Sequence, residues 1–152
     1  MTRLHWLAWL CAFASFGARE AGAEARRYVG ISVCRGCHEA EGDAFTKLAG
    51  KSRSYAAVQK MARELTAAET QECYGCHTTG YGKPGGFRSL EETPDLANVG
   101  CESCHGPGSA HAESGSREAI VLRPPQTVCD ACHTESRVRA FNYRPLRYAG
   151  AH

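Results

Sequence analysis

The sequence predicts a mostly helical and irregular fold, in which short helices wrap around bound groups instead of a large core of side chains. Three observations predict it. The chain has 152 residues, which is the length of about one domain. Eight of its nine cysteines form four C-x-x-C pairs whose first members are 39, 28 and 28 residues apart. Between the pairs, short stretches of helical periodicity alternate with loops rich in glycine and proline, so we expect no sheet of consequence.

The first 23 residues have the order of a secretory signal peptide. A short basic start (1–5) precedes an apolar run (6–16), and small residues follow that fit cleavage after Ala23 or Ala25. The apolar run is shorter than the roughly 20 residues that span a bilayer, which favours cleavage over an uncleaved anchor. We therefore expect residues 1–23 to be a signal peptide, residues 24–152 to form the mature domain, and the protein to be periplasmic.

A histidine follows each C-x-x-C pair directly. C-x-x-C-H is the signature of covalent haem attachment, in which two thiols form thioethers with the porphyrin and the histidine ligates the iron. The cysteines that we expect to hold haem are Cys34, Cys37, Cys73, Cys76, Cys101, Cys104, Cys129 and Cys132. The expected proximal iron ligands are His38, His77, His105 and His133. The motifs thus predict four covalently bound haem c groups.

The same cysteines have two other interpretations. An even number of cysteines in an exported protein is typical of a disulfide framework, and paired C-x-x-C units can form zinc sites. Neither explains a histidine after each of the four pairs, because a zinc ion needs only four ligands. Four haems also leave no cysteine unused in the mature chain.

Short helices are predicted around the first and second motifs. A helix is expected over 39–47, just after the first motif. Residues 54–65 predict a second helix because they place four apolar side chains at helical spacing: Val58, Met61, Ala62 and Leu65. Thr66 and Glu69 have the spacing of a capping box, which predicts a further helix running into the second motif.

Glycine and proline predict irregular structure in the second half of the chain. Residues 78–86 are expected to form a loop, and 106–109 a tight loop. Residues 90–100 have room for one turn of helix, limited by Pro94. The segment 123–125 is expected to be extended because two prolines follow Arg123.

The charge balance restricts the class of partner. From Glu24 onward the chain has 16 Lys+Arg and 15 Asp+Glu, so we expect no nucleic-acid partner. The haem propionates would make the loaded protein acidic unless they are paired. Residues 136–152 carry four arginines and no acid, which would suit propionate pairing or docking of an acidic redox partner; a solvated basic tail is the alternative.

Two stretches carry a family resemblance, 72–81 (ECYGCHTTGY) and 99–111 (VGCESCHGPGSAH). From Tyr28 through the four motifs, the chain resembles the tetrahaem cytochrome c-554 family. The resemblance implies a small multihaem c-type cytochrome, with short helices wrapped around four haems that form closely stacked pairs. It also implies that the histidine soon after the third motif, here His111, is the distal ligand of the first haem.

The supply of distal ligands separates this chain from the family pattern. No histidine lies between His38 and His77, where the family usually has a distal ligand. Outside the motifs the mature chain offers only His111 and His152, so at most two haems can be bis-histidine within one chain. The other irons would be five-coordinate, bound by another group, or completed by a partner. Met61 is one alternative ligand, but its position on an apolar stripe favours packing in the core.

The expected function is electron transfer between redox partner proteins, by a carrier that is not itself an enzyme. A second hypothesis is a redox enzyme that acts on nitric oxide, hydroxylamine or peroxide at an open-coordination haem. A third is a subunit of an oligomer or a membrane-associated redox complex, in which a neighbour supplies the missing ligands. The sequence does not identify the electron donor or acceptor.

Overall fold

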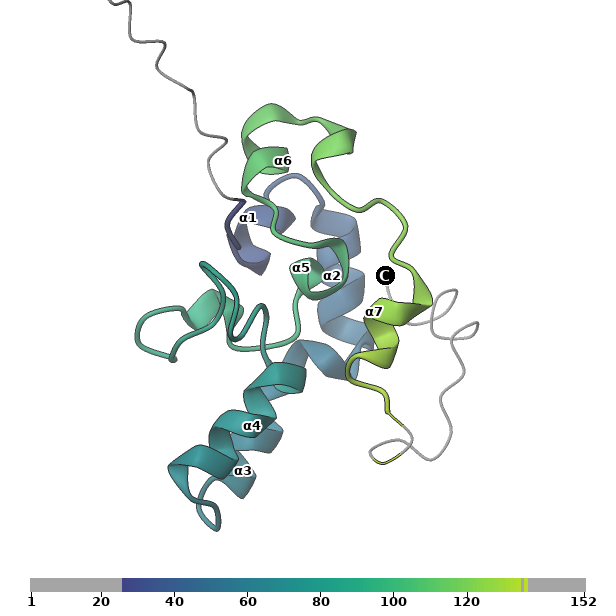
Figure 1. Cartoon of the computed structure of the whole chain (residues 1–152). Coiled ribbons are helices and arrows are strands. Elements are labelled where there is room, and N and C mark those ends of the chain that lie inside the picture. The colour runs from purple at the N-terminus through teal and green to yellow at the C-terminus, as the bar shows by residue number, and fades with distance from the viewer. Residues whose placement is uncertain (1–25, 135, 137–152) are drawn as a thin grey trace, which may run out of the picture.

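The computed structural model describes residues 26–134 and residue 136, and this part of the chain is helical without strands (Figure 1). Its α-helices are α1 (Ile31–Arg35), α2 (Glu39–Leu48), α3 (Tyr55–Met61), α4 (Ala67–His77), α5 (Cys101–His105), α6 (Ser109–Ser114) and α7 (Gln126–Asp130). Three 3₁₀ helices are η1 (Gly50–Arg53), η2 (Pro94–Leu96) and η3 (Arg117–Ala119). The prediction of a mostly helical and irregular fold is confirmed. The expected signal peptide, the segment 137–152 and His152 lie outside the described residues.

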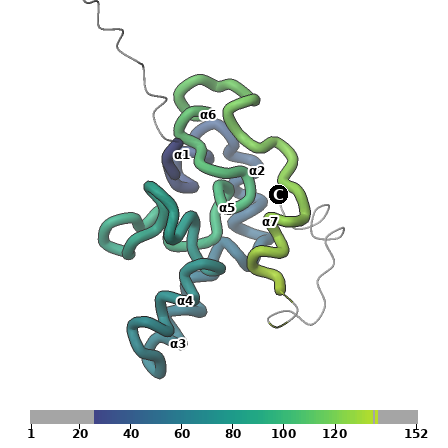
Figure 2. The backbone as a smooth tube through the Cα atoms, viewed as in Figure 1, coloured from purple at the N-terminus to yellow at the C-terminus, as the bar shows by residue number. Residues whose placement is uncertain are grey.

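The helices form a body and a projecting hairpin. Helices α3 and α4 pack side by side and extend away from α1, α2, α5 and α6 (Figure 1). The first described residues run beside the start of α6 (Figure 2), where the N–H of Arg27 donates to Oγ of Ser109 and the N–H of Ser109 donates to the carbonyl of Arg27. The start of the described chain is therefore joined to a segment 82 residues further along.

Each C-x-x-C-H motif lies in or at the end of a short helix. The first follows from α1, the second ends α4, the third is the whole of α5, and the fourth follows from α7. The backbone N–H of His38 and of His133 donates to the carbonyl of the first cysteine of its motif at 2.9 Å, so the helical turn continues to the histidine. Residues three apart share a helix face, which places both thiols of a pair on the same side.

The capping box predicted before the second motif is confirmed. Helix α4 begins at Ala67, and Oγ1 of Thr66 accepts a hydrogen bond from the N–H of Glu69. The Glu69 carboxylate in turn accepts the N–H of Thr66 at 2.8 Å. The backbone N–H of Thr66, with its hydroxyl, donates to the Glu69 carboxylate and so lowers the pKa of Glu69. The cap therefore determines where α4 starts, and α4 carries the second motif at its C-terminal end.

The two other predicted helices are present, but the apolar stripe on the second packs only in part. Helix α2 spans Glu39–Leu48, and α3 covers the first half of the predicted segment 54–65. Val58 is buried, whereas Met61 is 49% exposed. The expectation that Met61 packs in the core is wrong for this structure, because α3 ends there and only one side of the helix contacts α4.

The predicted loops are also confirmed, except that the loop expected over 106–109 ends one residue earlier, because Ser109 begins α6. Residues 78–86 contain no helix. The loop folds tightly on itself: Gly86 lies so close to Gly80 that a Cβ at Gly86 would be 1.7 Å from the carbonyl oxygen of Gly80. Pro94 starts the 3₁₀ helix η2, which is the single turn expected between residues 90 and 100. Pro125 is extended, with φ −72° and ψ 161°.

The polypeptide core of the described residues is small. Its one cluster of buried apolar side chains consists of Phe87, Leu96 and Ala97, with Tyr28, Tyr55, Tyr74 and Tyr81 packed against it. Tyr74 belongs to the second motif and lies edge-on to Tyr81 and Phe87, with ring centroids 5.2 Å apart in both pairs. Burial, with a smaller contribution from Tyr74, raises the pKa of Tyr55 to about 12. The aromatic cluster thus holds the base of the hairpin to the loop 78–100.

Thr79 connects the segments that flank this cluster. Its side chain is almost completely buried, and Oγ1 donates to the carbonyl of Asn98 at 2.6 Å and accepts the N–H of Gly100 at 2.9 Å. Its backbone N–H donates to Leu96, and its carbonyl accepts the N–H of Phe87. Thr79 follows the second motif closely and Gly100 precedes the third, so one residue fixes the spacing of two motifs.

We expect the substitution Thr79→Val to destabilise the folded protein by about 1–3 kcal/mol, because it leaves the N–H of Gly100 and the carbonyl of Asn98 without their partner in a buried place. Valine has nearly the same shape, so the loss isolates the hydroxyl. Chemical unfolding of the haem-loaded protein measures it. Thr127→Val, at an exposed position of α7, is the matched control. Equal stability of the two variants would contradict the assigned role.

Candidate haem attachment sites

The eight motif cysteines are all within the described part of the chain and none of them forms a disulfide there. Seven are half-buried and Cys37 is exposed. Thiols that are accessible at the surface of short helices can reach a porphyrin edge from outside the polypeptide. Across the described residues, no group of three or more His, Cys, Asp and Glu side chains is arranged to enclose a metal ion.

The thiols of different motifs approach one another in pairs. Cys34 of the first motif lies close enough to Cys101 of the third to alter its pKa, and Cys76 of the second motif acts likewise on Cys132 of the fourth. The third and fourth motifs are also close enough for Cys104 and Cys129 to interact electrostatically. The four motifs therefore form a connected series in space, in the order first, third, fourth and second.

These contacts alter the acidity of the thiols before any thioether forms. The neighbouring Cys34 thiol lowers the pKa of Cys101 to about 7, against the effect of burial, and Cys101 in turn raises the pKa of Cys34. Burial, assisted by Cys76, raises the pKa of Cys132 to about 11. Burial also raises the pKa of Cys104 and Cys129, and the ammonium group of Lys51 opposes it at both. Cys101 is thus the most acidic of the perturbed thiols.

In three histidines, Nδ1 is hydrogen-bonded to a backbone carbonyl oxygen. The partners are Ser54 for His77 at 2.9 Å, Val121 for His105 at 2.6 Å, and Ser116 for His111 at 2.8 Å. A carbonyl oxygen only accepts, so Nδ1 carries the proton and the lone pair is on Nε2. This is the tautomer and the outer hydrogen bond that metal-ligating histidines have in proteins.

Ser54 is a residue that the sequence did not single out for this role. Besides receiving the Nδ1 proton of His77 on its carbonyl, it donates its hydroxyl to the carbonyl of His77 at 2.8 Å and accepts the N–H of Val99 at 3.0 Å. Ser54 therefore holds both the imidazole and the backbone carbonyl of His77. No sequence pattern would have identified Ser54, because its partner lies 23 residues further along the chain.

His38 and His111 face each other, although 73 residues separate them. Their ring centroids lie 6.1 Å apart and their planes are inclined by 22°. A histidine nitrogen lies about 2 Å from the metal that it binds, so two imidazoles on opposite sides of one iron have centroids about 6.2 Å apart. The observed separation therefore fits one iron between the two rings.

The apolar surface near the motifs also fits porphyrin. Large apolar side chains are exposed in the described polypeptide, among them Val33 beside the first motif (47%) and Val121 with Leu122 beside His105. The buried apolar residues number only six: Phe45, Ala49, Val58, Phe87, Leu96 and Ala97. Porphyrins on the motif faces would cover the exposed side chains and supply the interior that the polypeptide lacks.

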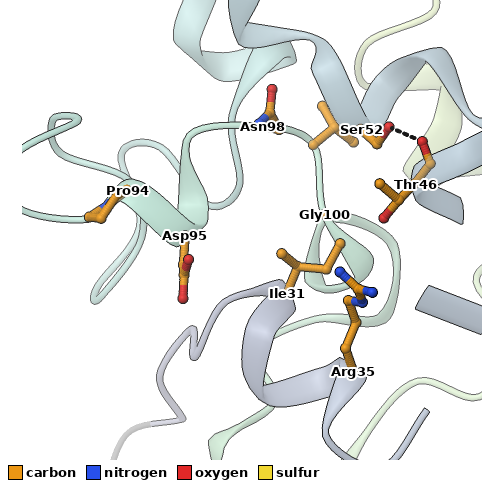
Figure 3. A pocket seen from close by; sticks show the side chains of 9 residues that line it. Ile31, Arg35, Thr46, Ser52, Pro94, Asp95, Asn98 and Gly100 are labelled. Atoms are coloured by element: carbon orange, nitrogen blue, oxygen red, sulfur yellow. Dashed lines mark hydrogen bonds between the residues drawn. The ribbon is translucent and has the colours of Figure 1, made fainter. Parts of the chain in front are cut away.

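A small polar cavity of about 220 Å³ lies between α1 and the segment before α5 (Figure 3). Its lining includes Ile31, Arg35, Thr46, Asp95 and Asn98. Pockets that hold drug-sized ligands have volumes of about 300–1,000 Å³, so this cavity is too small for a porphyrin. It contains no cysteine and no histidine, which leaves the haem surfaces on the open sides of the motif helices.

The four motif histidines and His111 lie in the described part of the chain, and His111 is brought to His38. His152 lies outside it. Within the described residues, no helix is long and apolar enough to cross a membrane.

Known proteins similar to this chain are cytochromes. Residues 33–106, which contain the first three motifs, match the profile of the family described as cytochrome c554 and c-prime. Cytochrome c-554 of Nitrosomonas europaea is 31% identical over 102 residues, which cover 58% of this chain and 43% of that protein. The structure of reduced cytochrome c554 from the same organism superposes with a TM-score of 0.52 at 25% identity, over 70% of this chain and 65% of that one.

The match thus spans less than half of the curated relative. The earlier resemblance is confirmed: over residues 33–106 this chain is similar to the cytochrome c554 family.

Proposed function

We propose that this protein is an exported c-type cytochrome that carries four covalently bound haems and transfers electrons between redox proteins. The observation that carries the proposal is the series of four C-x-x-C-H motifs whose thiols meet in pairs across the structure. Haem iron supplies a one-electron couple, and its ligands and surroundings determine the potential. This chain supplies the attachment of all four haems, their proximal ligands and their close spacing.

Close spacing is supported by the contacts between motifs. Cys34 and Cys101 interact, as do Cys76 and Cys132, and Cys104 lies near Cys129. Groups attached at these sulfurs would have adjacent edges, which favours electron movement along the whole series. The exposed apolar side chains near the motifs would be covered by the same groups. The family's printed descriptions name cytochromes, which agrees with this role.

Axial ligation is supported for the first haem by two residues. We propose His38 as its proximal ligand and His111 as its distal ligand, because the centroid separation of 6.1 Å leaves room for one iron. The carbonyl of Ser116 holds Nδ1 of His111 and thereby directs Nε2 away from its own helix turn. His152 is the second candidate for a distal ligand. We also propose that the protein is exported to the periplasm.

The proposal predicts that the protein, expressed with a haem-attachment system, is red and heavier than its processed polypeptide by four haems. Mass spectrometry measures this directly. The double substitution of Cys129 and Cys132 by alanine should remove one haem and leave three, because each pair holds its own porphyrin. A colourless protein that folds stably at the mass of the polypeptide would refute the proposal.

The axial assignment predicts that His111→Ala converts one low-spin iron into a high-spin iron. Removal of a strong-field sixth ligand leaves the site open or water-bound, and electron paramagnetic resonance of the oxidised protein counts both kinds. Glu113→Ala, on an exposed position of the same helix, is the matched control and should leave the count unchanged. An unchanged spectrum for His111→Ala would refute the assignment. The high-spin signal of the unaltered protein reports how many irons lack a sixth ligand.

A further inference from the structure

Glu102 is the one buried charged side chain in the described part of the chain. It is 3% exposed and lies between the two cysteines of the third motif. The haem attachment chemistry requires nothing of this position, because C-x-x-C-H accepts other residues between the cysteines. Its burial therefore calls for a separate explanation.

The Glu102 carboxylate is held by backbone N–H groups. Oε1 accepts from Gly108 at 2.7 Å and from Val29 at 2.9 Å. Oε2 accepts from Gly30 at 2.8 Å and from Val29 at 3.1 Å. A set of donors alone suits an ionised carboxylate, which only accepts, and a protonated acid would bring a donor of its own. We therefore treat Glu102 as a buried anion.

No cation offsets this charge directly in the described structure. The ion pairs there join other residues: Arg27 with Glu113, Arg35 with Asp43, and Arg88 with Glu92. Neutral N–H groups solvate the carboxylate without cancelling its net charge. In an interior of low dielectric constant, such a charge acts strongly on its neighbours.

The three donors belong to segments that carry other parts of the haem sites. Val29 and Gly30 lead directly into α1 and the first motif, and Gly108 leads into α6 with His111. Glu102 itself sits in α5, the third motif. One side chain therefore joins the third motif to both segments that bring His38 and His111 together.

We propose that Glu102 is a positioning residue for the first and third haem sites, and that its buried charge lowers the reduction potential of the haem beside it. This inference rests on the proposed function. An anion stabilises the oxidised iron, which carries one more positive charge than the reduced iron, and low dielectric surroundings strengthen the effect. The four hydrogen bonds from three backbone donors fix the mutual placement of α1, α5 and the start of α6.

The fourth motif provides a matched comparison. Asp130 occupies the same place in its motif as Glu102 does in the third, directly after the first cysteine, but it is exposed. Water and salt screen an exposed charge. Replacing the carboxylate by an amide at each of the two positions therefore compares the effect of a buried charge with that of a screened charge. Both charges occupy the same place in their motifs.

The test is a redox titration of the haem-loaded variants Glu102→Gln and Asp130→Asn. In the titration of Glu102→Gln, we expect the midpoint potential of at least one haem to be 59 mV or more above its value in the unaltered protein. For a one-electron couple, this is a tenfold change in the ratio of oxidised to reduced haem. Asp130→Asn should shift less. Potentials of Glu102→Gln that equal those of the unaltered protein, or shifts of equal size in both variants, would overturn the proposal.

Haem loading is mapped by mass spectrometry of proteolytic fragments, since Glu102→Gln also places an amide NH₂ against backbone donors. Loss of haem from the first or third motif alone supports the positioning role. Loss from all four motifs means general misfolding and overturns it. Absence of haem from the unaltered protein would instead refute the proposed function, so the two failures are distinguishable.

A second variant tests the position of the carboxylate while keeping its charge. A Cβ at Gly108 would lie 3.1 Å from Oε1 of Glu102, and the backbone there (φ −93°) accepts alanine. We expect Gly108→Ala to change the low-spin g values of one haem, because they depend on the angle between the two axial imidazole planes. Gly50→Ala, whose Cβ would meet no atom within 4 Å, is the control. Identical spectra for the two variants would count against the positioning role.

Discussion

The shortage of apolar core is the constraint on which the rest of the structure depends. The described residues bury only one small cluster, and larger apolar side chains such as Leu48 and Leu122 stay exposed. A domain of this size normally gains most of its stability from buried apolar surface. Covalent haem removes the need for it, because each porphyrin brings a large apolar surface and a bond that unfolding does not break. The helices can therefore be short, and each has only to present one motif.

Polar contacts between distant segments perform the positioning that a larger core would otherwise perform. Thr79, just after the second motif, is hydrogen-bonded to the segment that precedes the third motif. Ser54 makes two hydrogen bonds with His77. Glu102 joins the third motif to the first and to α6. Each of these residues uses hydrogen bonds to the backbone, whose geometry is narrow. Such contacts set distances between motifs more strictly than the packing of a few loose aliphatic side chains would.

Much of this could be predicted from the sequence because its strongest signals are local. The capping box at Thr66 and Glu69 and the loop 78–86 depend on neighbours a few residues away, and both are present. The packing of Met61 was predicted wrongly because periodicity indicates a face but not what lies against it. Ser54, Lys51 and Glu102 could not be assigned roles, since most of their partners are distant in the sequence, as His77 is from Ser54 and Val29 is from Glu102. The pairing of His38 with His111 came from family resemblance and not from spacing.

The outer partners of the histidines have an evolutionary consequence. Nδ1 of His77, His105 and His111 is held by carbonyl oxygens of the main chain, at Ser54, Val121 and Ser116. Every residue type has that oxygen, so mutation can replace the side chains at Val121 and Ser116 without deleting the acceptor. Substitutions at these positions therefore leave the orientation of the imidazoles unchanged. Only insertions, deletions or prolines that displace the backbone would alter that orientation.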